Sequence, residues 1–268
     1  MWQGQHFLVP WLNGAPYSDK PPLLFWLIQG GWWLFGVNDW WPRLIGPLAA
    51  TASAALTASL ARRLWPVLPA PAATAPLLLA GSLAWIVFGQ MLMFDTLLTV
   101  FVLLGISALW TLSQAERAGP RALLILAMAA GILTKGPIAL VHVLVPGLLG
   151  PWWAPGLRQR WGRWTLLLLA SGLAALLVAG LWALPAAMAG GPAYGEAILW
   201  HQTAGRMGQS FAHARPWYAY LVFLPLMLLP WVLVPWSWRA RPLPSDRGTR
   251  LVLAWGPGVM LALSLLSA

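Results

Sequence analysis

Residues 164–186 read WTLLLLASGLAALLVAGLWALPA, a run without a single charged side chain. An α-helix rises about 1.5 Å per residue, so about 20 apolar residues cross the hydrocarbon core of a bilayer. A helix also satisfies its own backbone hydrogen bonds, which lipid cannot do. This stretch therefore predicts a transmembrane helix.

The composition of the whole chain indicates the same solvent. Only 8% of the 268 residues are charged, 60% are hydrophobic, and the mean hydropathy is +0.71. A soluble domain cannot carry that much apolar surface in water. Because charge-free runs recur evenly along the chain, we expect an all-α, polytopic membrane protein that forms one helix bundle and one domain, 1–268.

The distances between charged residues define eight candidate spans of about 20 residues each. They are 42–62, 73–93, 96–115, 120–134, 136–157, 164–186, 216–238 and 250–268. The run from Pro21 to Asn38 is also apolar, but charged residues bracket it and Gly30-Gly31 lies in its middle. It either crosses the membrane or lies along the interface.

The basic residues predict which end of the bundle faces the cytoplasm. The chain has sixteen Lys and Arg residues, and alternate loops divide them eleven to five. The larger set is Arg62, Arg63, Arg117, Arg121, Arg158, Arg160, Arg163, Arg239, Arg241, Arg247 and Arg250, and the smaller is Lys20, Arg43, Lys135, Arg206 and Arg215. The positive-inside rule places the larger set in the cytoplasm. Asp19, Asp39, Asp95 and Glu196 then face outward, which indicates a site on the outer side.

Three further features of the composition narrow the class of protein. The net charge of +10 is scattered between apolar runs and not gathered into one face, which argues against nucleic-acid binding. There is no cysteine, so disulfides and thiolate metal sites are excluded. Many of the 21 tryptophans lie near the ends of apolar runs, as expected for anchors at the headgroup interface.

Lys20 stands where a turn-forming stretch meets an apolar run, in Tyr17-Ser18-Asp19-Lys20-Pro21-Pro22. The two prolines allow a helix to start at Pro22 and keep Lys20 outside it. A lysine with its stem in the apolar layer can hold a lipid phosphate, or it can be a snorkelling anchor.

Asp95 and Lys135 each have a structural and a functional interpretation. Asp95 lies where two predicted spans meet outside, and it either caps the second helix or belongs to a site. The helix before Lys135 is short, so it begins nearer Gly119 or Lys135 lies below the interface. Gly136-Pro137 breaks that helix, and broken backbone at membrane depth often lines a cavity. The partner of Lys135 is then a lipid phosphate or a carboxylate such as Asp95.

The outer loop from Ala187 to Arg215 is the most polar part of the chain. Arg206 and Arg215 either bind phosphate or sugar or face lipid headgroups. His201 with a carboxylate suggests a divalent metal, although no structural zinc spacing is present.

These segments, in this order, resemble bacterial members of glycosyltransferase family 39, which includes the aminoarabinose transferase acting on lipid A and relatives of protein O-mannosyltransferases. The matching segments are Phe7-Leu8-Val9-Pro10 with Asn13-Gly14, Tyr17-Ser18-Asp19-Lys20-Pro21-Pro22-Leu23, Trp26, Leu34-Phe35-Gly36, Arg43, Ala61-Arg62-Arg63-Leu64, Phe94-Asp95-Thr96-Leu97-Leu98, Leu133-Thr134-Lys135-Gly136-Pro137, and His213-Ala214-Arg215-Pro216-Trp217 with Tyr220. Nearly the whole chain is covered.

The resemblance implies a GT-C-type bundle, with 1–40 as an outer-face loop and juxtamembrane helix and 41–268 as the transmembrane helices. It also implies a cavity for a polyprenyl-phosphate sugar. The implied roles are donor phosphate binding for Lys20, Arg43 and Lys135, catalysis for Asp19 and Asp95, substrate binding for Tyr17, Arg206, His213 and Arg215, and a divalent metal at Asp19 and His201.

One departure from the family concerns its principal catalytic carboxylate, which belongs to an Asp-Glu motif that should precede Met1. We therefore expect a chain truncated at both ends. The resemblance implies sugar transfer to a lipid, glycan or protein acceptor at the outer face of the bacterial inner membrane. The alternatives are a transporter or flippase for a lipid-linked or anionic substrate, and an inactive fragment.

Overall fold

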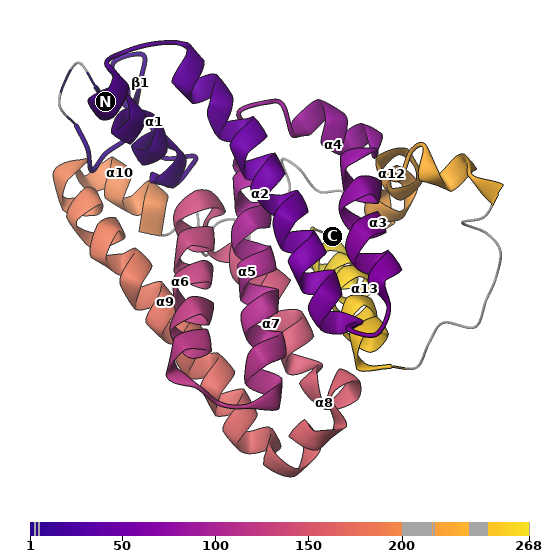
Figure 1. Cartoon of the computed structure of the whole chain (residues 1–268). Coiled ribbons are helices and arrows are strands. Elements are labelled where there is room, and N and C mark those ends of the chain that lie inside the picture. The colour runs from indigo at the N-terminus through magenta and orange to yellow at the C-terminus, as the bar shows by residue number, and fades with distance from the viewer. Residues whose placement is uncertain (3, 5, 200–215, 217, 236–245, 268) are drawn as a thin grey trace.

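The chain folds as a bundle of α-helices, which confirms the predicted fold class. The computed structural model describes residues 1–268 except 3, 5, 200–215, 217, 236–245 and 268 (Figure 1). Within the described residues, the only β-structure is a hairpin of β1 (Trp11–Leu12) and β2 (Ala15–Pro16). Its turn residues Asn13 and Gly14 have φ of 50° and 80°, as the Asn-Gly sequence favours in a two-residue hairpin.

Five of the predicted spans are helices long and apolar enough to cross a membrane. They are α2 (Trp40–Leu64), α5 (Phe94–Gln114), α6 (Ala118–Lys135), α9 (Trp161–Ala189) with the preceding 3₁₀ helix η2 (Pro155–Arg160), and α13 (Arg247–Ser267). The 18 residues of α6 extend about 27 Å, so Lys135 lies at the end of a nearly full-length span.

The other three predicted spans are interrupted in the structure. The interruptions give α3 (Pro69–Ala80) and α4 (Leu83–Phe88); η1 (Pro137–Leu140), α7 (Val141–Leu148) and α8 (Gly150–Trp153); and α12 (Ala219–Met227) with η5 (Trp231–Leu233). Gly81 follows α3, Pro137 starts η1, Pro151 lies in the first turn of α8 and Pro230 precedes η5. Pro146 and Pro225 lie two residues before the ends of α7 and α12. Proline lacks the amide that continues a helix, and its ring clashes with the preceding turn. A hydropathy count does not register either effect.

Tryptophan indoles satisfy backbone carbonyls at many of these irregular places. Buried Trp153 and Trp164 donate to the carbonyl oxygens of Pro146 and Gly147, each at 2.8 Å, where α7 ends. Five more indoles do the same elsewhere: Trp26 to Phe7, Trp32 to Asn38, Trp41 to Leu27, Trp182 to Leu8 and Trp231 to Leu78. These tryptophans therefore stabilise the fold by hydrogen bonds, a role that their expected place at the interface does not include.

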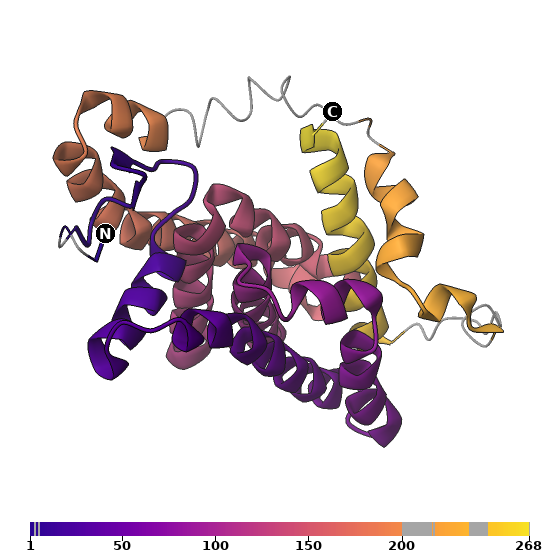
Figure 2. The same cartoon turned by 90° about the horizontal axis from the view of Figure 1, so that it is seen from above.

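Helix α5 is the centre of the bundle. It packs antiparallel to α6 and also contacts α2 and α7 (Figure 1). Its side chains Ile106, Leu109 and Leu112 are fully buried and share one core with Leu124 of α6 and Leu168 of α9. Figure 2 shows the helices gathered around this core, with α13 and α12 side by side at its edge.

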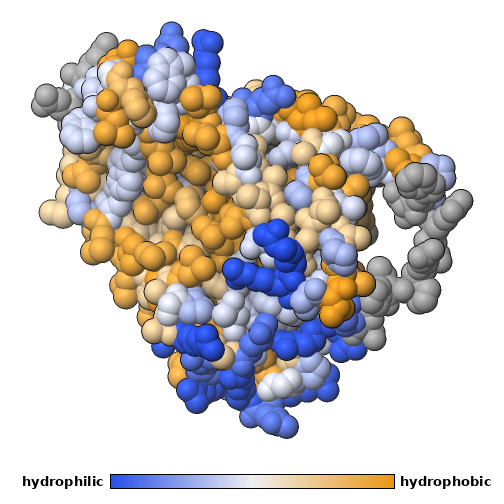
Figure 3. Space-filling model, viewed as in Figure 1, coloured by the Kyte–Doolittle hydropathy of each residue, from blue (hydrophilic) through white to orange (hydrophobic). Residues whose placement is uncertain are grey.

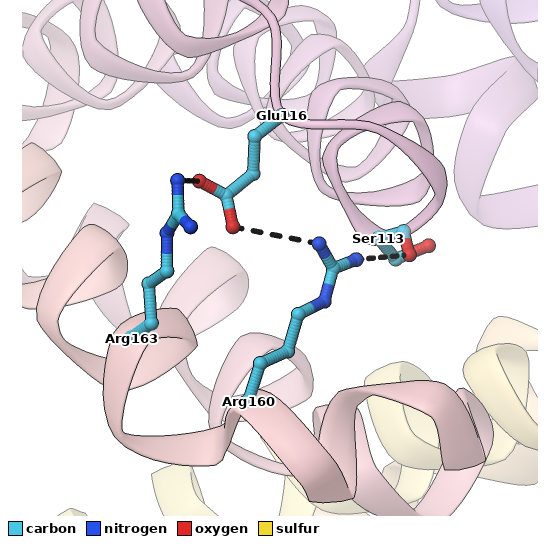
Figure 4. A network of polar contacts seen from close by, with 4 residues as sticks. All are labelled: Ser113, Glu116, Arg160 and Arg163. Carbon is cyan, nitrogen blue, oxygen red and sulfur yellow. Dashed lines mark hydrogen bonds and ion pairs between the residues drawn. The ribbon is translucent and has the colours of Figure 1, made fainter.

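The two ends of the bundle differ in charge, as the division of basic residues predicts. The middle of the visible face is mainly hydrophobic, and hydrophilic residues gather over its lower end, near α8 and the start of α9 (Figure 3). At that end Glu116, between α5 and α6, pairs with Arg163 at 3.0 Å and Arg160 at 3.4 Å (Figure 4). Arg160 also donates to the Ser113 carbonyl oxygen at 2.9 Å. These contacts hold η2 and α9 against the C-terminus of α5, where cations are favoured.

Helix α1 (Leu23–Phe35) lies at the opposite end and packs against α2 and α6. Its 13 residues extend about 20 Å, which is too short for the hydrocarbon core. It begins directly after Pro21-Pro22 and ends at Gly36, whose φ is 73°. Leu24 anchors it in a cluster with Ile45, Ala49 and Leu97. This geometry favours the interfacial alternative for 21–38.

The contact between α1 and α2 depends on the absence of a side chain at Gly31. A β-carbon there would lie 1.7 Å from Nε1 of Trp41, whose indole donates to the Leu27 carbonyl oxygen. We expect Gly31→Ala to lower the free energy of unfolding by about 1–3 kcal/mol, the usual cost of overpacking. Thermal unfolding in detergent, followed by tryptophan fluorescence, measures this loss.

The neighbouring Gly30→Ala is the matched control, because a β-carbon at Gly30 meets no atom within 4 Å. Replacing a helical glycine with alanine should stabilise by up to about 1 kcal/mol. Equal unfolding temperatures for the two variants would show that α1 is not held in this way.

Candidate functional site

Asp95 and Lys135 meet at the end of the bundle that carries α1. Asp95 lies in the first turn of α5 and Lys135 is the last residue of α6, so the antiparallel packing of these helices brings them together. The Lys135 ammonium donates to Oδ1 of Asp95. The carboxylate alternative for the partner of Lys135 is thus the one observed. The two side chains are 57% and 32% exposed for Asp95 and Lys135, so both remain accessible.

The capping interpretation of Asp95 is wrong. Met93 is the N-cap residue of α5, and no side chain caps that helix by a hydrogen bond. Asp95 is instead a first-turn acid, where a carboxylate is favoured by the helix dipole. Its side chain is directed to Lys135, 40 positions away in the sequence.

Gly136 fixes the position of Lys135 at the helix end. Its backbone has φ 84° and ψ −171°, a conformation that is essentially restricted to glycine. The Gly136 amide donates to the Ile132 carbonyl oxygen at 2.7 Å, and Pro137 then starts η1. The Lys-Gly-Pro sequence therefore ends α6 and turns the chain in a single step.

A cavity of about 200 Å³ lies beside this turn. Ser18 and Pro21 before α1, and Gly136 and Pro137 after α6, line it together with residues of α6, of α9 and of the segment after α10 (Pro192–Glu196). These further lining residues are Ile132 of α6, Leu176, Ala179, Gly180, Trp182 and Ala183 of α9, and Ile198 and Leu199 after α10. The walls are mostly apolar. In the sequence, Asp19 and Lys20 lie between the wall residues Ser18 and Pro21, and Lys135 directly precedes the wall residue Gly136.

Tyr17 is joined to the start of α5 by aromatic contacts. Its ring meets Phe25 edge-on with centroids 6.1 Å apart, and Phe25 meets Phe94 in the same way at 5.9 Å. The Tyr17 amide also donates to the Pro10 carbonyl oxygen at 2.7 Å. The loop that carries Asp19 and Lys20 is therefore packed close to the helix turn that carries Asp95.

Of the remaining candidates, the structure describes only Arg43. Arg43 is exposed in the first turn of α2, and the described hydrogen bonds and ion pairs do not link it to Asp95 or Lys135. Its phosphate-binding role stays a prediction. His201, Arg206, His213 and Arg215 lie outside the described residues.

The predicted metal site is not tested by the described residues, which include Asp19 but not His201. Asp19 is exposed, and a carboxylate oxygen suits a hard divalent cation. Among the described residues, no group of three His, Cys, Asp or Glu side chains could hold a metal ion. A site at Asp19 and His201 stays a prediction.

The structure brings further side chains to the site that the sequence analysis did not select. His142 of α7 lies within electrostatic range of both Asp95 and Lys135, although it sits inside an apolar run. Trp182 lines the cavity and donates to the Leu8 carbonyl oxygen at 2.8 Å. Nearby, burial raises the pKa of the Tyr194 phenol to about 12, so it stays protonated at neutral pH. The sequence did contain a signal for His142 and Trp182, because an ionisable or hydrogen-bonding side chain within a predicted span often belongs to a site.

Together the fold and the site define a multi-pass integral membrane protein with an acid–base pair and a mostly apolar cavity at one end of its helix bundle. The family described as dolichyl-phosphate-mannose-protein mannosyltransferase matches residues 19–183, and the chain belongs to this family. The predicted family relationship is thereby confirmed.

Two relatives of known name are both arabinosyl transferases. The undecaprenyl phosphate-alpha-4-amino-4-deoxy-L-arabinose arabinosyl transferase 1 of Pseudomonas fluorescens (strain Pf0-1) is 32% identical over 83% of this chain and 38% of its own. The corresponding transferase of Edwardsiella ictaluri is also 32% identical, over 97% of this chain and 47% of its own. The chain thus spans less than half the length of these relatives.

A solved structure shares the fold. The crystal structure of ArnT from Cupriavidus metallidurans bound to undecaprenyl phosphate aligns with a TM-score of 0.78 at 23% identity, covering 99% of this chain and 49% of that one. The apo structure of the same protein aligns with a TM-score of 0.77. The alignment covers the interrupted helices as well as the continuous spans.

The exposure of the Asp95–Lys135 pair predicts that it contributes little to stability. A double-mutant cycle of Asp95→Asn and Lys135→Gln should give a coupling free energy of about 1 kcal/mol or less, as solvent-accessible ion pairs do. Denaturant unfolding of the four proteins in one detergent measures it. A coupling above about 3 kcal/mol would assign the pair a structural role instead.

Proposed function

We propose that the protein to which this chain belongs is a membrane glycosyltransferase that takes its sugar from a polyprenyl-phosphate donor. The observation that carries the proposal is the mostly apolar cavity whose walls include Gly136, directly after Lys135, and Ser18 and Pro21, on either side of Asp19-Lys20 in the sequence. Apolar walls suit an isoprenoid chain, and lysine ammonium groups suit a phosphate. The names of the relatives, which specify undecaprenyl phosphate and aminoarabinose, support the same donor class and a pentose.

The charge that develops in the reaction explains the need for cations. In a polyprenyl-phosphate sugar the phosphate is a diester, and it becomes a monoester with additional negative charge when the bond to the sugar breaks. A group that binds this developing charge accelerates the step more than one that binds the donor uniformly. At 4 Å and an effective dielectric constant of 20, two unit charges interact by about 4 kcal/mol. Lys20 and Lys135 are proposed for this role, with Arg43 as a third cation.

Asp95 keeps Lys135 in place for this role. An ammonium has three N–H donors, so Lys135 can retain Asp95 while it donates to a phosphate oxygen. The acceptor hydroxyl attacks the anomeric carbon and displaces polyprenyl phosphate with inversion. A general base, for which we propose a carboxylate, takes the proton of that hydroxyl as it attacks. Tyr17 and Asp19, in the loop over the cavity, are proposed to contact the substrates.

We further propose that the protein lies in a bacterial inner membrane with this site facing the periplasm. The five long apolar helices support a multi-pass membrane protein. The excess of arginine at the opposite end supports an orientation with that end in the cytoplasm. A lipid acceptor, as for the aminoarabinose transferases of lipid A, fits a site at the bilayer surface.

Lys20→Ala in the full-length protein should reduce transfer from a lipid-linked sugar about 10- to 100-fold. This range corresponds to one hydrogen bond to a charged group, worth about 1.5–3 kcal/mol. The assay is transfer of labelled sugar in proteoliposomes. Arg121→Ala is the control, since Arg121 is exposed at the opposite end of α6. Unchanged transfer by the Lys20 variant would remove Lys20 from the site.

Asp95→Asn should lower turnover at least about tenfold while the protein still inserts and folds, because Lys135 loses the charge that holds it. Turnover at saturating donor is the measurement, with circular dichroism as the folding check. Asp39→Asn, an exposed acid just before α2, should leave turnover unchanged. Full activity of the Asp95 variant would limit Asp95 to pairing without consequence for the reaction.

A further inference from the structure

A second hollow lies at the arginine-rich end, far from the Asp95–Lys135 pair. It has a volume of about 520 Å³ and lies between the end of α2 and the beginning of α3. Its walls, within the described residues, are Arg62, Trp65, Leu68, Ala72 and Ala73 with two prolines. The hollow combines one guanidinium, one indole and a short apolar strip.

The carboxylates of the protein do not balance the positive charge of the arginines at this end. The whole sequence has six acids, and all six are among the described residues. The two at this end are Glu116, which pairs with Arg160 and Arg163, and Asp246. The described ion pairs do not include Arg62 or the adjacent Arg63, and both are exposed.

Asp246 is occupied as the cap of α13. It accepts hydrogen bonds from the Gly248 amide at 2.8 Å, the Thr249 amide at 3.1 Å and the Thr249 hydroxyl at 2.7 Å. Burial alone would raise the pKa of Asp246, but hydrogen bonds from Thr249, Gly248 and the wall residue Trp65 outweigh burial and lower it, so the carboxylate is ionised at neutral pH. Asp246 is thus committed to the start of α13 and to Trp65, and the described ion pairs do not join it to Arg62. Arg62 is therefore available to an anion from outside the protein.

The surroundings of the hollow are exposed and apolar. Helix α3 has no buried residue, and Leu77 and Leu78 farther along it are exposed. The apolar strip of Leu68, Ala72 and Ala73 continues into this surface. An occupant whose charged end meets Arg62 and whose apolar end follows α3 must itself be amphipathic.

We propose that this hollow binds one anionic phospholipid from the leaflet that meets the arginine-rich end. The lipid phosphate pairs with Arg62, the Trp65 ring packs against the glycerol region, and an acyl chain follows Leu68, Ala72 and Ala73. Basic pockets between membrane helices take anionic headgroups in this way, and tryptophan favours the headgroup level. The site is separate from sugar transfer and does not depend on it.

Native mass spectrometry of the full-length protein tests the site, with phosphatidylglycerol titrated against phosphatidylcholine. Arg62→Ala should weaken retention of the tightest phosphatidylglycerol about five- to tenfold, the effect of one lost cation near the headgroup. Arg63→Ala removes the same charge one position away, outside the walls of the hollow, and should retain the lipid. Ala73→Trp fills the hollow without a charge change and should also weaken retention.

Two results would overturn the proposal. Equal weakening by Arg62→Ala and Arg63→Ala would show diffuse attraction to a basic surface. No weakening by Arg62→Ala and Ala73→Trp would show that the retained lipid does not lie in this hollow. Circular dichroism and size-exclusion profiles of each variant separate loss of lipid from loss of fold.

Discussion

Every backbone amide and carbonyl at membrane depth must be bonded within the protein, because lipid offers no partner. The continuous helices meet this requirement by themselves. The interrupted segments meet it through turn hydrogen bonds of the backbone and through tryptophan indoles. Trp153 and Trp164 donate to the carbonyl oxygens of Pro146 and Gly147 in the last turn of α7. These hydrogen bonds allow the chain to turn inside the bundle, and the cavity and the site depend on such turns.

The antiparallel packing of α5 and α6 determines where chemistry can occur. It places the first turn of α5 next to the last turn of α6, so an acid and a base far apart in sequence become neighbours. Gly136 then ends α6 at once, and the chain opens toward the cavity. At the other end of the same two helices, Glu116 and two arginines hold the connection against α9. The α5–α6 pair thus has an accessible end at Asp95 and Lys135, and a fastened end where Glu116 is held by two arginines.

The two charged ends serve different requirements. At the fastened end, ion pairs and the cation–π contact of Arg247 over Trp110, at 5.0 Å, hold segments that are distant in sequence. At the accessible end, the Asp95–Lys135 pair remains open to solvent and lies beside a mostly apolar cavity. Exposed ion pairs contribute little to stability. The small expected contribution to stability agrees with the phosphate-binding role proposed for Lys135.

Composition and charge pattern alone predicted a membrane protein, the helical fold class, the five spans that are continuous helices, and which end of the bundle carries most of the arginines. These features depend on sums over many residues. The motifs also predicted Lys135 and Asp95 as partners among other choices. The tertiary structure decided that α1 is a short helix, that three predicted spans are broken, that Asp95 pairs and does not cap, and that α9 lines the cavity. Those features depend on single prolines, glycines and indoles and on which helices pack together, and hydropathy averages do not contain that information.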